Sequence, residues 1–197
     1  MPDDKNLNTV QQYVGDMVAL ESHIEEALDR QLDEVKDHPE ASAAVHRFHT
    51  MVRSQRDTAR AHLQTIGGSE SHPVKSAVAG LFGAAAGVID SLRTKPVSKC
   101  LRDDYTAFNL AAIGYAMLHT TAHLLGQQAT ADLAERHLRG YAGAVQEINQ
   151  LIANVVAWEL RKEGHAMDDR MVGHATETLN RVWRETAPSY AGTRRAA

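Results

Sequence analysis

The stretch from Tyr105 to Gly126 constrains the fold more than any other part of the chain. It reads YTAFNLAAIGYAMLHTTAHLLG and contains no Asp, Glu, Lys or Arg over about six helical turns. A helix that is apolar on every side lies in a protein core or in a membrane, and Asn109, His119 and His123 favour the protein core. We therefore expect this helix at the centre of the fold, with the rest of the chain wrapped around it.

Composition favours one cytoplasmic domain without cross-links. The chain has 197 residues, enough for one sizeable core, and a net charge of −4 with acidic and basic residues interspersed. This charge pattern predicts no binding to nucleic acid and no stable membrane insertion. Cys100 is the only cysteine, which excludes an internal disulfide and a cysteine-rich zinc site. The N-terminus is acidic and polar, unlike a signal peptide.

Apolar residues recur at helical spacing along the chain, and the alternation typical of a β-strand is not sustained anywhere. We predict five main helices: residues 7–35, Pro39 to Gly67, Pro96 to Gly126, Thr130 (as N-cap) to about residue 162, and residues 168–185. Proline suits the first turn of a helix, and glycine suits the residue that ends one. A shorter Gly/Ala-rich helix over residues 74–92 is expected in the connection 69–95, where Gly80, Gly83 and Gly87 allow close packing on a neighbouring helix or subunit.

Two long helix pairs joined by one long crossover are the ferritin-like version of the four-helix bundle. We predict an all-α, ferritin-like four-helix bundle with a helical crossover in residues 1–165. A C-terminal amphipathic helix packed on the bundle should occupy residues 166–187, and residues 188–197 should be a disordered tail. The last helix carries Met171, Ala175, Leu179 and Val182 on one side, so it caps the bundle or docks a partner.

Several polar residues fall at core-facing positions of these helices. They are Glu21, Gln55, Asn109, His119, His137 and Tyr141. A ferritin-like di-iron centre needs four carboxylates and two histidines, with a Glu-x-x-His step on two helices, and the bundle helices contain no such step. Amides bind hard cations weakly, so Gln55 and Asn109 are poor replacements for glutamate.

Two interpretations of these residues remain. In the first, Glu21, Gln55, Asn109, His119 and Tyr141 form a polar core network that fixes helix register. In the second, Glu21, His119 and His137 bind a single metal ion or a small ligand. A haem carrier with His119 or His137 as axial ligand is a third possibility.

Other candidate groups carry weaker signals. His119 and His123 are four residues apart, as in a pair that shares a metal, but no third ligand accompanies them, so we expect hydrogen bonds to neighbouring helices. His46 and His49, also one turn apart, are expected at the surface. Cys100 lies beside basic residues, but nothing completes a catalytic constellation, so we expect an unreactive thiol.

The segment Leu20–Leu28, LESHIEEAL, is similar to the first-helix signature of the YciF-type ferritin-like proteins. The pattern Leu110–Gly114, followed by Leu124–Gly126 and Ala131–Leu133, resembles the third bundle helix of that family and the turn after it. The resemblance covers about residues 7–156. It implies a bundle that often dimerises, a carboxylate and histidine metal centre in some members, an association with bacterial stress responses, and no settled activity.

Position by position, Glu21 matches the family's first-helix glutamate. Other residues stand at the family's remaining ligand positions: Gln55, Ala59, Asn109, Gly140 and Tyr141. We therefore expect a non-enzymatic binding or structural protein, a stress-related homodimer with a degenerate di-metal site and no cofactor. Its protein partner, if any, would dock on the crossover helix or the C-terminal helix. The alternative is a protein that binds a metal or small cofactor through Glu21 and the core histidines.

Overall fold

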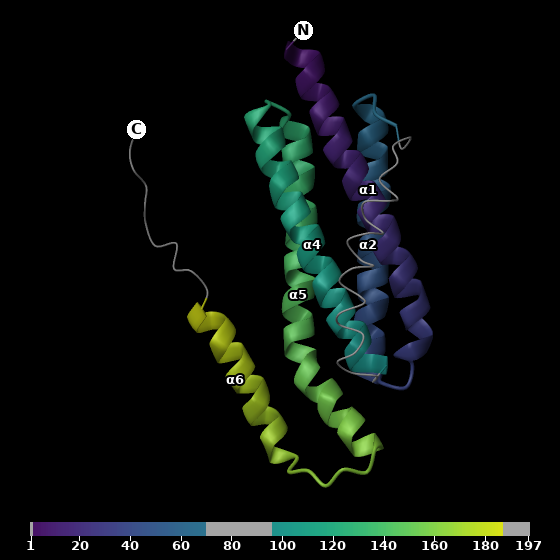
Figure 1. Cartoon of the computed structure of the whole chain (residues 1–197), viewed down its shortest axis with the longest axis vertical. Helices are drawn as coiled ribbons and strands as arrows, with labels where there is room; N and C mark the ends of the chain where they lie inside the picture. Colours follow the sequence, from purple (N-terminus) through teal and green to yellow (C-terminus); the bar gives the residue numbers. More distant parts are fainter. Residues whose placement is uncertain (1, 70–95, 187–197) are drawn as a thin grey trace.

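The computed structural model describes residues 2–69 and 96–186, and the elements within these ranges are all helices. Four long helices form a bundle (Figure 1): α1 (Pro2–Glu34), α2 (Pro39–Thr65), α4 (Pro96–Leu124) and α5 (Gln128–Lys162). A shorter helix, α6 (Arg170–Thr186), lies beside α5. The predicted all-α bundle is confirmed. The expected helix at residues 74–92 and the tail at 188–197 lie outside the described residues.

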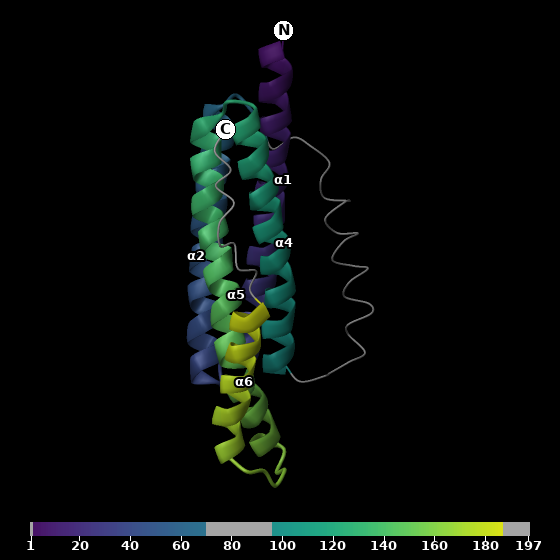
Figure 2. The same ribbon diagram turned by 90° about the vertical axis from the view of Figure 1, so that its left-hand side faces the viewer.

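The four long helices form a closed ring. Helix α1 packs on α2 and α4, and α5 packs on α4 and α2. Figures 1 and 2 show that α2 ends at the end of the bundle where α1 begins, whereas α4 begins at the opposite end. Neighbouring helices are therefore antiparallel, and one core lies between all four.

The predicted helix faces supply that core. All seven positions predicted from the three- and four-residue spacing are buried, six in α1 and Val35 directly after it: Val14, Met17, Glu21, Ile24, Leu28, Gln31 and Val35. In α2, the predicted positions from Ala41 to Ala59 are buried as well, and His62 and Ile66 at its end are half-buried. The periodicity of the apolar residues thus predicts which side of each helix faces inward.

Three glycines end three helices. Gly67, Gly126 and Gly164 have φ of 77°, 73° and 78°, a conformation that only glycine adopts without strain. The next N–H in each case bonds back to a carbonyl of the last turn, as in Gln127 N to Ala122 O at 2.8 Å. The helix ends predicted at Gly67 and Gly126 are confirmed.

The start of α5 differs from the prediction. Thr130 is not the N-cap, because α5 already begins at Gln128. The Thr130 hydroxyl instead lies 2.7 Å from His62 Nε2 and links α5 to the end of α2. At the start of α2, His38 Nδ1 accepts a hydrogen bond from the Ala41 amide at 3.2 Å, a cap that the sequence did not reveal.

Helix α4 is not enclosed on all sides, so that prediction was wrong. In the ring, α4 packs on α1 and α5, and among the described residues its outward side is only partly covered. Ile113 is 57% exposed and Met117 49% exposed on that side. The outward positions of α4 are uncharged rather than uniformly apolar: Thr106, Asn109 and Thr120 are exposed on the helix together with Ile113 and Met117.

Gly126→Ala should lower the free energy of unfolding by about 1–2 kcal/mol, because alanine is strained at positive φ. Gly143→Ala is the matched control: Gly143 lies inside α5, and an added Cβ meets nothing within 4 Å. There the same change should raise the free energy of unfolding by about 0.5–1 kcal/mol. Urea denaturation of both variants measures this, and an equal effect at the two sites would contradict the assigned helix end.

Candidate functional site

Hydrogen-bonded side chains from three helices meet inside the bundle. Glu21 of α1 is fully buried, and its Oε1 accepts hydrogen bonds from Tyr115 of α4 at 2.7 Å and Tyr141 of α5 at 3.1 Å. His137 Nδ1 lies 2.8 Å from the Tyr115 hydroxyl oxygen. The Tyr115 proton is donated to Glu21, so His137 donates from Nδ1 to Tyr115. We call Glu21, Tyr115, His137 and Tyr141 the core polar cluster.

Aromatic packing positions the two hydroxyl groups. The rings of Tyr115 and Tyr141 stack with centroids 5.9 Å apart, and Phe108 packs against Tyr141 at 5.7 Å. Burial, together with the adjacent Glu21 charge, raises the pKa of both tyrosines well above the usual value. Both phenols therefore keep their protons and serve as donors to the carboxylate.

Two buried acceptor atoms, one in the core polar cluster and one beside it, lack hydrogen-bond donors among the described residues. Glu21 Oε2 and Gln55 Oε1 are buried and have no hydrogen-bond partner among the described residues. Gln55 Nε2 donates to the His137 carbonyl at 3.4 Å. A Cβ at Gly140 would lie 2.3 Å from Gln55 Nε2. Gly140 thus leaves the room that the Gln55 side chain occupies.

Glu25, one turn after Glu21, is a second buried carboxylate, and the sequence analysis did not single it out. It accepts a hydrogen bond from Arg53 Nε at 3.0 Å and pairs with Arg56, both on α2. His49 lies on the same side and is 2.9 Å from Asp29. The expectation that His49 lies at the surface was wrong, since this side chain is only 13% exposed. In the sequence, the two arginines on α2 were the available indication that a neighbouring helix carries a buried carboxylate.

The core polar cluster does not fit a di-metal centre. Glu21 is its only carboxylate, one oxygen of that carboxylate already accepts two hydrogen bonds, and Glu25 is neutralised by arginines. Across residues 2–69 and 96–186, no three His, Cys, Asp or Glu side chains come close enough to hold a metal ion together. One carboxylate and one histidine are too few ligands for two hard cations.

The structure brings together four of the six predicted polar residues: Glu21, Gln55, His137 and Tyr141. Asn109 is exposed on α4 and donates to the Tyr105 carbonyl at 2.7 Å, so its predicted place in the core was wrong. His119 is half-buried and lies 3.0 Å from the Ala131 carbonyl oxygen, outside the cluster.

The His119 ring packs edge to face on His123 at 4.7 Å. The hydrogen bond between His119 and the backbone carbonyl on α5 is of the kind that we expected for this histidine pair.

Tyr115, the residue that links Glu21 to His137, was missed by sequence reasoning. It stands within the uncharged stretch, at a position of α4 that is fully buried. A buried tyrosine usually finds a partner for its hydroxyl group. This rule, combined with the buried position of Glu21 on α1, was the signal available in the sequence.

Cys100 is buried near the start of α4. Its Sγ donates to the Glu34 carboxylate at 3.2 Å, and burial and the Glu34 charge raise the pKa of the thiol. A thiol with a raised pKa is a poor nucleophile, because the reactive species is the thiolate.

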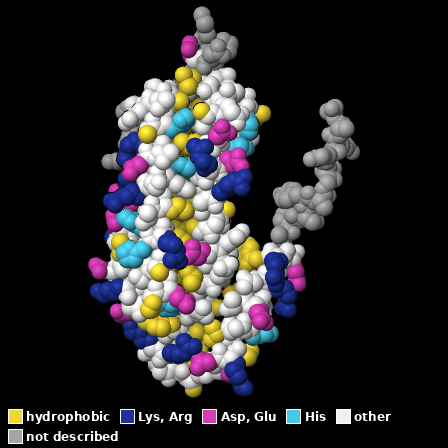
Figure 3. All heavy atoms as spheres, turned by 180° about the vertical axis from the view of Figure 1, so that it is seen from behind, with side chains coloured by type: hydrophobic (Ala, Val, Ile, Leu, Met, Phe, Trp, Pro, Cys, Tyr) yellow, Lys and Arg dark blue, Asp and Glu magenta, His cyan; other side chains and the backbone are white. Residues whose placement is uncertain are grey.

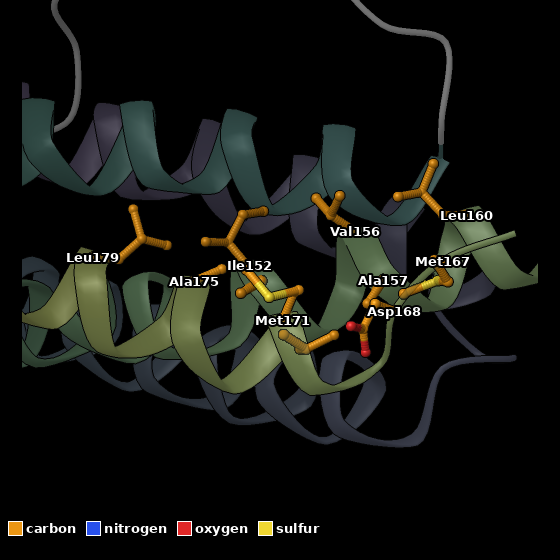
Figure 4. Close-up of a pocket in the computed structure, with 11 residues that line it drawn as sticks. Ile152, Val156, Ala157, Leu160, Met167, Asp168, Met171, Ala175 and Leu179 are labelled. Carbon is orange, nitrogen blue, oxygen red and sulfur yellow. The ribbon is translucent and has the colours of Figure 1, made fainter. Parts of the chain in front are cut away.

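Helix α6 forms an apolar groove with α5. Figure 4 shows Ile152, Val156 and Leu160 of α5 opposite Met171 and Leu179 of α6, around a cavity of about 490 Å³. Apolar side chains are visible in the hollow between α6 and the bundle (Figure 3). None of the described α6 side chains is fully buried. The helix lies along the bundle without sealing its own apolar side.

Trp183 of α6 is 50% exposed, and its ring lies 6.5 Å from that of Tyr105 on α4. The C-terminal part of α6 therefore lies close to the first part of α4. Within the described ranges, none of the helices is apolar over enough residues to cross a bilayer.

Comparison with known proteins places the fold. A family model described as "Domain of unknown function (DUF892)" matches residues 11–161. No curated protein matches the sequence. The chain is similar to a crystal structure of a protein from Xanthomonas campestris pv. campestris, with a TM-score of 0.67 and 16% identity. That match covers 81% of this chain and 99% of the other, so the shared fold spans the bundle.

Tyr115→Phe should destabilise the protein more than Tyr141→Phe. The first change removes a hydroxyl that serves both Glu21 and His137, whereas the second removes one longer hydrogen bond to Glu21. We expect losses of about 2–3 kcal/mol and about 1 kcal/mol in the free energy of unfolding. Chemical denaturation measures both, and a larger loss for Tyr141→Phe would contradict the assigned hydrogen-bond order.

Proposed function

Because this chain belongs to the DUF892 family, we propose that it is a divergent, YciF-type ferritin-like protein that acts in binding or structure rather than in catalysis. A cytoplasmic, stress-related role is part of the proposal and rests on the resemblance of its helix motifs. The single observation that carries the proposal is the bonding of Glu21. The carboxylate that matches a metal ligand of the family accepts hydrogen bonds from two tyrosines.

A buried carboxylate is stable only if donors or cations compensate for its lost hydration. In this chain Tyr115 and Tyr141 supply the donors, and the arginines on α2 compensate Glu25. Because these partners come from α2, α4 and α5, the polar groups favour one register of the four helices. The proposed role of the former ligand position is therefore structural.

A second candidate is a single-metal or small-cofactor site, and one observation favours it. Glu21 Oε2 and Gln55 Oε1 are buried acceptors without partners among the described residues. His137 Nδ1 lies 3.6 Å from Glu21 Oε1, so an imidazole is also close by. Glu21 and His137 with the Gln55 amide oxygen would be the ligands.

Elemental analysis and an absorption spectrum of the untagged, purified protein separate the two candidates. We expect no stoichiometric iron, manganese or zinc and no Soret band. Glu21→Gln should then change only stability, by about 1–3 kcal/mol, because the amide keeps one acceptor oxygen. His119→Gln is the control, since His119 lies outside the core polar cluster. A bound metal that is lost in Glu21→Gln and retained in His119→Gln would overturn the structural role.

Homodimer formation is the other part of the proposal, and the exposed apolar side chains support it. Ile113 and Met117 are exposed on α4, and Met171, Val182 and Trp183 are exposed on α6. Exposed apolar patches of this kind often mark protein interaction sites. A stable interface buries about 800 Å² on each partner, so both helices would have to contribute.

Light scattering after size exclusion should give twice the chain mass of 21.6 kDa for the wild-type protein. Trp183→Glu should shift the mass toward the monomer, because it places a charge in the exposed apolar side of α6. Arg181→Gln alters net charge by the same amount at another exposed position of α6 and should leave the dimer intact. A wild-type monomer, or a dimer unaffected by Trp183→Glu, would contradict a dimer formed through α6.

A further inference from the structure

A small cavity lies between α1 and α4, on the side of Glu21 toward the start of α4. Its volume is about 240 Å³, and its walls combine apolar side chains with charged ones. Gln31 of α1 and Asp104 of α4 both line it, and both are more than nine-tenths buried, with exposed fractions of 9% and 3%. Neither residue belongs to the core polar cluster.

The two buried residues present unsatisfied acceptors. Asp104 Oδ2 and Gln31 Oε1 have no hydrogen-bond partner among the described residues. The Gln31 side chain lies close enough to Asp104 to lower the pKa of its carboxyl group, against the larger opposite effect of burial. When Asp104 is ionised, both of these oxygens are acceptors only, so a group that satisfies both must donate twice. Ammonium and guanidinium groups are donors only and meet this requirement.

The charges around the cavity also favour a cation. Glu26 on α1 and Asp103 on α4 line it together with Asp104, against a single arginine, Arg30. His23, the remaining titratable residue of the lining, lies 3.9 Å from Glu26. From these observations we propose that the cavity binds the ammonium group of a small aliphatic amine, with Asp104 as its counter-ion and Gln31 as the second acceptor.

The proposed site has a pH dependence of known sign. Burial raises the pKa of Asp104 to about 8, so its carboxyl group is neutral at pH 7 when the cavity holds no cation. A bound cation favours the ionised form, so binding below about pH 8 releases a proton. Affinity should rise about tenfold for each pH unit up to about pH 8 and then level off.

The experiment is a titration of the full-length protein with butylammonium chloride, followed by calorimetry and by amide NMR shifts. Butanol, the neutral analogue, is the ligand control. We expect butylammonium to shift the amides of Ala27 and Ala107 in the cavity wall and to show the stated pH dependence. Butanol should cause neither effect, because it carries no positive charge.

Variants test the assigned residues. Asp104→Asn should lose at least tenfold in affinity at about pH 8, together with the pH dependence, because the amide cannot ionise. Asp103→Asn serves as the comparison: it removes a charge that raises the pKa of Asp104, so the pH dependence should remain but level off at a lower pH. Arg30→Gln should strengthen binding, because it removes from the cavity wall a positive charge that repels the ammonium group.

Absence of binding by butylammonium, or equal binding by wild type and Asp104→Asn, would overturn the proposal. A lysine of a second molecule carries the same ammonium group, so sedimentation velocity is run in parallel. If the wild-type protein is a dimer, and it dissociates both when butylammonium is added and when Asp104 is replaced by Asn, the ligand of the cavity is a lysine of the second copy. Binding without any change in sedimentation assigns it to a free amine.

Discussion

The charge of Glu21 lies inside the bundle, far from water, and the surrounding side chains are arranged to compensate for it. Tyr115 donates from α4 and Tyr141 from α5, and His137 supports Tyr115. Rotating or sliding any of these helices by one residue would break a hydrogen bond to the carboxylate. The aromatic packing of Phe108 and the two tyrosines follows from this requirement, because the hydroxyl groups must point inward.

Three buried carboxyl groups on α1 and α4 show three different environments. Glu21 is held by neutral donors, and Glu25 by the guanidinium groups of α2. Asp104 keeps its proton, because burial raises its pKa more than the neighbouring Gln31 amide lowers it. The same residue class thus serves as an anchor for helix register, as half of an ion pair, and as a group that can still change its charge. A cavity of about 240 Å³ lies beside Asp104.

Local patterns in the sequence predicted the local features of the fold. Spacing of apolar residues gave the buried side of α1, and Gly126 gave the end of α4, because both depend on neighbours along the chain. The outer face of α4 was misjudged, because Ile113 and Met117 are apolar although they face outward. The partner of His119 is a backbone carbonyl, and backbone groups leave no mark in a sequence. Glu21 and His137 were predicted to be close, whereas Tyr115 between them was not.

The close contact between Gln55 and Gly140 makes the two positions depend on each other. Any side chain at position 140 would overlap the Gln55 amide, which lies 2.3 Å from where its Cβ would be. A side chain at position 140 is therefore accommodated only if the Gln55 side chain moves to another rotamer. The residue that position 140 tolerates thus depends on the side chain at position 55 and on the rotamer it adopts.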